Sequence, residues 1–141
     1  MKNIFNLILT GSRRFMLLLT VFLLLLPASV RAQVTGMRVG SGAARIRIVL
    51  DMDKAAKWKD QSTKDRILLE IDTAAKNRIQ RKLNDASVSD VVLEKAGKKT
   101  AKLQVNLKKP AQHRVLMLKN PNRLVIDVYR IQIVKVSKDL G

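Results

Sequence analysis

The feature that most constrains the fold is an alternating apolar run that occurs twice along the chain. In the run 123–129, Leu124, Ile126 and Val128 share one face, because successive side chains of a β-strand point to opposite sides. A turn signal, Asn-Pro-Asn, stands immediately before this run. Residues 66–71 repeat the run 57 positions earlier. The equivalent pairs are Arg66 and Arg123, Leu69 and Ile126, and Glu70 and Asp127.

A second pair of runs has the same offset. Its equivalent residues are Ile46 and Leu103, Ile48 and Val105, and Leu50 and Leu107. An internal repeat indicates that residues 34–72 and 87–130 are two copies of one small β unit. Each copy is expected to supply four strands with one apolar face, which is too little to form a stable core alone. We therefore predict an all-β protein, a β-sandwich of two symmetry-related four-stranded sheets.

The strand 45–52 alternates strictly, so its two faces can be assigned residue by residue. The residues predicted to face the core are Ile46, Ile48, Leu50 and Met52. Those predicted to face water are Arg45, Arg47 and Asp51. The segment 73–84 between the halves is different, because alanine, lysine, arginine and glutamine replace the β-branched residues. Ala75 and Ile79 recur at helical spacing, so this segment is expected to be either a short connecting helix or an irregular connector.

Residues 1–32 have the pattern of a secretory signal peptide, with a helical apolar core. Basic residues precede an apolar run over 15–26, and small or apolar residues at Val30 and Ala32 favour cleavage after Ala32. The apolar run is shorter than the ~20 residues that span a bilayer, and an uncleaved membrane anchor is the alternative. We expect an exported protein of the periplasm or cell envelope.

The remainder of the chain is then a domain over 33–130 and a C-terminal extension or linker over 131–141. The chain carries a formal charge of +17. The leader holds four basic residues and no acid, so 24 basic and 11 acidic residues remain after cleavage, a charge of +13. Such a surface attracts polyanions. Export argues against a nucleic-acid partner and favours an anionic cell wall.

The residue inventory restricts catalysis. There is no cysteine, which excludes disulfides and thiolate chemistry. The single histidine, His113, cannot supply the ligand set of a zinc amidase. Asp51 and Asp127 are candidates for the paired carboxylates of a glycosidase, but strand aspartates more often cap turns or pair with arginine. We therefore expect a protein that is not an enzyme and has no metal and no cofactor.

Three segments together resemble an AMIN domain, the non-catalytic module found in front of bacterial N-acetylmuramoyl-L-alanine amidases and in some secretins. They are an opening strand, Val-Thr-Gly-Met-Arg-Val at 34–39, an Arg-Ile-Val-Leu-Asp-Met strand at 47–52, and the closing run Asn-Pro-Asn-Arg-Leu-Val-Ile-Asp-Val-Tyr at 120–129. The resemblance covers residues 34–130. It implies a sandwich of two symmetry-related four-stranded sheets and binding to peptidoglycan.

The candidate peptidoglycan-binding residues follow from the chemistry of the polymer. Sugar faces stack on aromatic plates, and stem-peptide carboxylates bind arginine forks. The candidate aromatic residues are Trp58 and Tyr129, and the candidate arginines are Arg38, Arg45, Arg47, Arg66 and Arg123. For Trp58 the alternative is packing in or beside the core, and for the arginines it is a solvated strand face that discourages edge pairing.

These observations predict an exported peptidoglycan-binding module that localises a cell-wall amidase, another hydrolase domain or an envelope complex. The alternative is an assembly adaptor that binds a protein of an envelope machine. A membrane partner is expected only through an uncleaved leader.

Overall fold

The computed structural model describes residues 16–22, 24 and 32–130, which belong to two separate units. In the first unit, residues 16–22 and 24 are helical and exposed. No stretch of the described helical residues is long and apolar enough to cross a membrane. Residues 1–15, 23, 25–31 and the extension 131–141 lie outside the described residues, whereas Ala32 and Gln33, which flank the predicted cleavage site, are described. The second unit holds the domain, which is built from strands.

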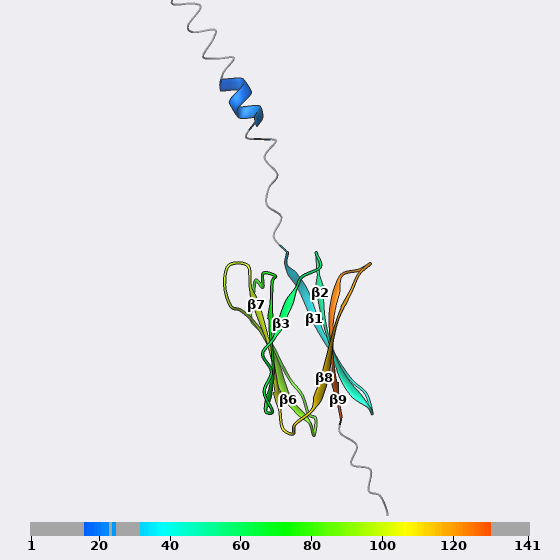
Figure 1. Ribbon diagram of the computed structural model, residues 1–141. Coiled ribbons are helices and arrows are strands. Elements are labelled where there is room, and N and C mark those ends of the chain that lie inside the picture. The colour runs from blue at the N-terminus through cyan, green and yellow to red at the C-terminus, as the bar shows by residue number, and fades with distance from the viewer. Residues whose placement is uncertain (1–15, 23, 25–31, 131–141) are drawn as a thin grey trace, which may run out of the picture. The chain divides into compact units, whose positions relative to one another are not determined.

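The strands of the domain are β1 (Val34–Ser41), β2 (Arg45–Met52), β3 (Trp58–Asp60), β4 (Arg66–Ile71), β5 (Ile79–Lys82), β6 (Val88–Lys95), β7 (Ala101–Leu107), β8 (Gln112–Leu118) and β9 (Arg123–Tyr129). They form a four-stranded sheet in the order β1-β2-β9-β8 and a five-stranded sheet in the order β3-β4-β7-β6-β5. All neighbouring strands are antiparallel. The two layers stand face to face (Figure 1), which confirms the predicted β-sandwich.

The two halves of the repeat do not form one sheet each. The first half gives β1 and β2 to the four-stranded sheet and β3 and β4 to the other sheet. The second half gives β6 and β7 to the five-stranded sheet and β8 and β9 to the first. Exchanging equivalent strands converts the order β1-β2-β9-β8 into β6-β7-β4-β3. The two sheets are therefore symmetry-related, and each is completed by both halves.

The helix predicted for residues 73–84 is wrong. This segment contains β5, which pairs with β6 and makes the second sheet five-stranded. A twelve-residue helix has little stability without packing, whereas the free edge of β6 offers hydrogen-bond partners along its length. Ile79 lies opposite the buried Leu93 and packs against the core. The rest of the segment is irregular, in agreement with the alternative prediction.

The core lies between the sheets and consists of their inward-facing residues. Ile46, Ile48, Leu50 and Met52 are buried as predicted. Of their equivalents in β7, Leu103 and Val105 are fully buried, whereas Leu107 is half-buried near the end of its strand. The strand alternation read from the sequence is therefore correct in both halves.

Candidate functional site

The outer face of the four-stranded sheet carries most of the candidate binding residues. Strand register aligns Arg47 with Asp127 and Asp127 with Arg114, and it aligns Asp51 with Arg123. We call this surface the arginine face. Its outward residues in β2 and β9 are Arg45, Arg47, Val49, Asp51, Arg123, Val125, Asp127 and Tyr129, and β1 and β8 add Gly36, Arg38, Gly40, Gln112, Arg114, Leu116 and Leu118.

Asp127 is the central acceptor of the arginine face. Arg47 donates to its two carboxylate oxygens at 2.7 and 2.9 Å, and Arg45 donates at 3.5 Å. The residue is only 1% exposed although it points away from the core. The hydrogen bond from Arg47, followed by the nearby positive charges, lowers the pKa of Asp127, although burial of the carboxyl opposes this shift. The ionised carboxylate therefore holds the Arg47 guanidinium in a fixed orientation.

Asp51 is the second acceptor, and it holds Arg38 by a two-point contact. The Nε and Nη2 atoms of Arg38 donate to its two oxygens at 2.9 and 2.7 Å. Both Asp51 and Asp127 are thus paired with arginine, which agrees with the expectation that strand aspartates more often pair with arginine than serve as the carboxylates of a glycosidase. Arg123, the register partner of Asp51, is different, because its Nε is buried without a hydrogen-bond partner among the described residues.

The arginine face has an excess of positive charge. Five arginines stand against two aspartates, which leaves three positive charges uncompensated. The Arg38 side chain is 63% exposed, and those of Arg45 and Arg47 are 45% and 43% exposed. A guanidinium has five N–H donors, so an arginine that gives two to an aspartate keeps others for a ligand. The face can bind carboxylates or phosphates.

The structure brings together five of the seven candidate residues. Arg38, Arg45, Arg47, Arg123 and Tyr129 all lie on the arginine face. Tyr129 is half-buried directly opposite Arg45.

The other two candidates lie on the five-stranded sheet. Arg66 is exposed on the outer face of β4, which belongs to the five-stranded sheet. Trp58 is aligned with the buried Ile71 and packs against the core, half-buried at the sheet edge. This position favours the packing alternative for Trp58 over a sugar plate.

Sequence reasoning missed Arg114 as a member of the site. It is exposed in β8 and lies opposite Asp127, on the other side from Arg47. The alternation of β8 is a usable signal, because it places Arg114 outward with Leu116. What the alternation does not reveal is that β8 pairs with β9, which determines its neighbours. Among the described residues, no cluster of three or more His, Asp or Glu side chains is arranged to hold a metal ion.

Comparison with known proteins gives a similarity of fold. No protein-family model matches the chain, and no curated protein matches it. A crystal structure of a hypothetical protein from Synechocystis is similar with a TM-score of 0.56 and 24% sequence identity. The match covers 70% of this chain and 16% of that chain. At this identity the similarity shows the sandwich fold alone.

Proposed function

We propose that this protein is an exported, non-catalytic module that binds peptidoglycan through the arginine face and so localises a cell-wall enzyme or an envelope complex. The observation that carries the proposal is the gathering of five arginines on one exposed face. Their guanidinium groups bind carboxylates in a planar, two-point geometry, and stem peptides of the wall present carboxylates. The resemblance of the sequence to an AMIN domain supports the same function.

The ion pairs prepare the arginine face for such a ligand. Arg38 and Arg47 are each held by two hydrogen bonds to an aspartate. Their side chains are therefore already ordered in the folded protein, which reduces the entropy lost when a ligand binds. Val49 and Leu116 lie between the charged rows and offer a small apolar surface to N-acetyl and methyl groups. In this proposal, Asp51 and Asp127 orient the arginines and are not catalytic carboxylates.

Co-sedimentation with washed sacculi across a salt series tests the proposal. The bound fraction is expected to fall as salt screens the exposed arginines and to persist in part at high salt. The double variant Arg38→Gln, Arg45→Gln should weaken binding by about tenfold. Arg47 is left intact, because its removal takes the main partner from the buried Asp127.

The matched control is the double variant Lys59→Gln, Arg66→Gln, which removes the same charge from the five-stranded sheet. It should bind sacculi like the parent. Equal loss in both double variants would mean that net charge alone drives binding. A parent chain that stays in the supernatant at every salt concentration would refute wall binding and favour the assembly adaptor.

A further inference from the structure

The sandwich has four strand edges, and β1 is the longest of them. β1 and β8 border the four-stranded sheet, and β3 and β5 border the other. Edges present unpaired backbone groups that template pairing with another chain unless charges or short length prevent it. β3 has only three residues, and β5 carries Arg81 and Lys82.

β8 has seven residues and, like β1, carries a single arginine, and its His113 is bound to Asp60 of the opposite sheet. β1 has eight residues and a single charged side chain, Arg38, which Asp51 holds over the sheet. Val39, Gly40 and Ser41 follow without a charge. The edge of β1 is therefore long, with Arg38 as its single charged strand residue, and Arg130 contacts the hydroxyl of its last residue, Ser41.

The register shows which backbone groups of β1 are available. Met52 N–H donates to Asn122, and Arg130 N–H donates to Ala44, so the even-numbered residues of β2 direct their backbone groups to the β9 side. The odd-numbered residues of β2 then direct their backbone N–H and C=O groups to β1. There Arg47 is opposite Gly40, and Val49 is opposite Arg38. Along an antiparallel pair, hydrogen-bonded and non-hydrogen-bonded residue pairs alternate. The residues of β1 that alternate with Arg38 and Gly40 therefore direct their N–H and C=O groups away from β2, to the open edge. These residues are Met37, Val39 and Ser41.

The chain itself already pairs with the beginning of this edge. Ala74 forms a parallel bridge with Gln33, donating to the Ala32 carbonyl at 2.8 Å and accepting from Val34 N–H at 2.9 Å. The connector then turns away toward β5. No other backbone partner occupies the outward groups of Met37, Val39 and Ser41 within the described range 32–130. The edge is thus competent for strand addition and open over its second half.

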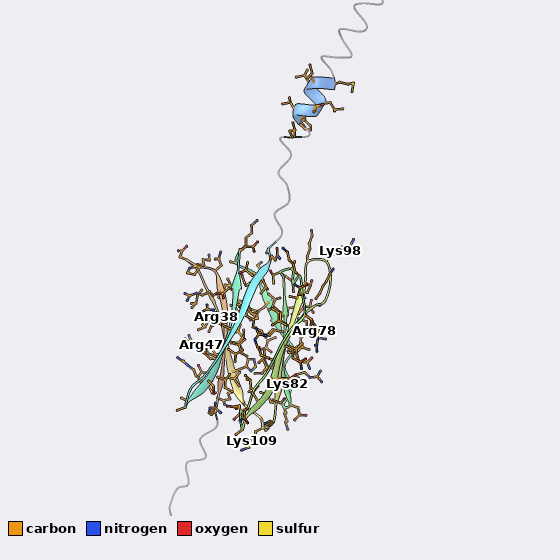
Figure 2. All side chains as sticks on the ribbon, turned by 180° about the vertical axis from the view of Figure 1, so that it is seen from behind. Arg38, Arg47, Arg78, Lys82, Lys98 and Lys109 are labelled. Carbon is orange, nitrogen blue, oxygen red and sulfur yellow. The ribbon has the colours of Figure 1, made fainter. Side chains whose placement is uncertain are left out.

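A hollow in the arginine face adjoins the open part of the edge. Its volume is about 260 Å³, and it is lined by Arg38, Val39, Gly40, Arg47 and Val49. A Cβ atom at Gly40 would meet nothing within 4 Å, so the absence of a side chain there keeps the hollow open. Figure 2 shows Arg38 and Arg47 on this layer, whereas Arg78 and Lys82 lie on the other. An added strand would set alternate side chains beside two guanidinium groups.

We propose that the edge of β1 binds an extended acidic segment of a partner protein by strand addition, with its acidic side chains directed to Arg38 and Arg47. Main-chain hydrogen bonds to Met37, Val39 and Ser41 provide affinity, and the hollow selects the acidic residue. Pairing between two copies of β1 is disfavoured, because it gathers their Arg38 side chains on one face. The inference goes beyond wall binding, since it depends on the backbone of β1.

The experiment uses the 141-residue chain and a labelled, end-capped octapeptide of alternating glutamate and threonine. Fluorescence anisotropy measures its affinity, and amide hydrogen exchange locates it. We expect slower exchange at the amides of Met37, Val39 and Ser41. A peptide with lysine in place of glutamate, and one with proline at every second position, should not bind.

Two pairs of variants separate the backbone contribution from the side-chain contribution. Val39→Pro removes an outward N–H and should weaken peptide binding by about tenfold, whereas Val39→Thr keeps the N–H and should bind like the parent. Gly40→Glu and Gly40→Gln have the same size, and a Cβ atom at the exposed Gly40 meets nothing within 4 Å. The glutamate competes for Arg38 and Arg47 and should weaken peptide binding more than the glutamine.

The outcomes distinguish this inference from the proposed function. Val39→Pro keeps every arginine and should leave retention on sacculi unchanged while peptide binding falls. Peptide binding with exchange protection at β8 or β5, or without protection at β1, would overturn the inference. So would equal binding of the lysine peptide, formation of a dimer that slows the same β1 amides without peptide, or unchanged peptide affinity in both Val39→Pro and Gly40→Glu.

Discussion

Asp85 shows how a single carboxylate joins the two layers. Arg130 follows β9 and donates to Asp85 at 2.6 Å, just before β6, and it also donates to Ser41 at 2.8 Å. The backbone N–H groups of Ser87 and Val88 donate to the other carboxylate oxygen. The hydrogen bond from Arg130, reinforced by these amides and opposed by burial, lowers the pKa of Asp85 to about 2. The contact therefore requires the ionised form.

This pKa predicts a loss of stability in acid. Since the pKa in the folded state lies below the ordinary value of 3.8, the contribution of Asp85 is present above about pH 4 and is lost as the pH falls toward 2. Asp85→Asn should lower the free energy of unfolding at pH 7 by on the order of 2 kcal/mol. Urea unfolding at several pH values measures the difference between parent and variant.

The difference should shrink as the pH falls through about 2, because protonation of Asp85 then gives both chains an uncharged side chain at position 85. The exposed Asp72 provides the control, and Asp72→Asn should change stability little at any pH. A difference for Asp85→Asn that stays constant with pH would show that the charge of Asp85 is unimportant.

Strands β2 and β7 are the equivalent central elements of the two sheets. β2 lies between β1 and β9, and β7 lies between β4 and β6. Ile48 and Val105 occupy equivalent inward positions, and both are fully buried. Each therefore contacts apolar side chains of both layers, and the two sheets depend on each other for their core.

Truncation at these two positions measures that dependence. Ile48→Ala should lower the free energy of unfolding by about 2–5 kcal/mol, and Val105→Ala by somewhat less, because each leaves a cavity in a closed core. Arg66→Ala, on the exposed face of β4, should stay within about 0.5 kcal/mol of the parent. Chemical denaturation provides the values, and parent-like stability of both core variants would contradict the strand register.

At the scale of the whole domain, the central fact is that each half completes the sheet of the other. β2 of the first half pairs with β9 of the second, and β4 of the first half pairs with β7 of the second. The strands within residues 33–76 pair only as two hairpins, and those within residues 77–130 pair only as the adjacent strands β5-β6-β7 and the β8-β9 hairpin, because the central partners come from the other half. Isolated hairpins have marginal stability in water.

The two halves should consequently fold only together. Fragments 33–76 and 77–130, produced separately, are expected to lack the dispersed amide NMR spectrum of the intact domain. Mixing them should restore it, because the fragments then supply all central pairs. The continuous segment 33–130 is the positive control. A folded spectrum from either fragment alone would mean that the pairing across the repeat is not required.

From the sequence alone, most of the strands could be located and the inward side of residues 45–52 could be assigned, although β5 was missed. This succeeded because alternation with a period of two is a local property, readable from neighbours such as Ile46 and Ile48. It also located most of the arginine face, since Arg45 and Arg47 are outward wherever their strand is placed. The pairing of strand aspartates with arginine was likewise predictable from charge alone.

Which strands are neighbours depends, in contrast, on contacts between distant parts of the chain. Pairing across the repeat buries Asp127 beneath Arg47, adds Arg114 beside it and places Arg66 on the other sheet. Pairing also converts residues 79–82 from a marginal helix into β5, because the edge of β6 offers partners that a local pattern cannot reveal. Contacts between residues distant in sequence depend on how the whole core closes, and that information is not contained in any single segment.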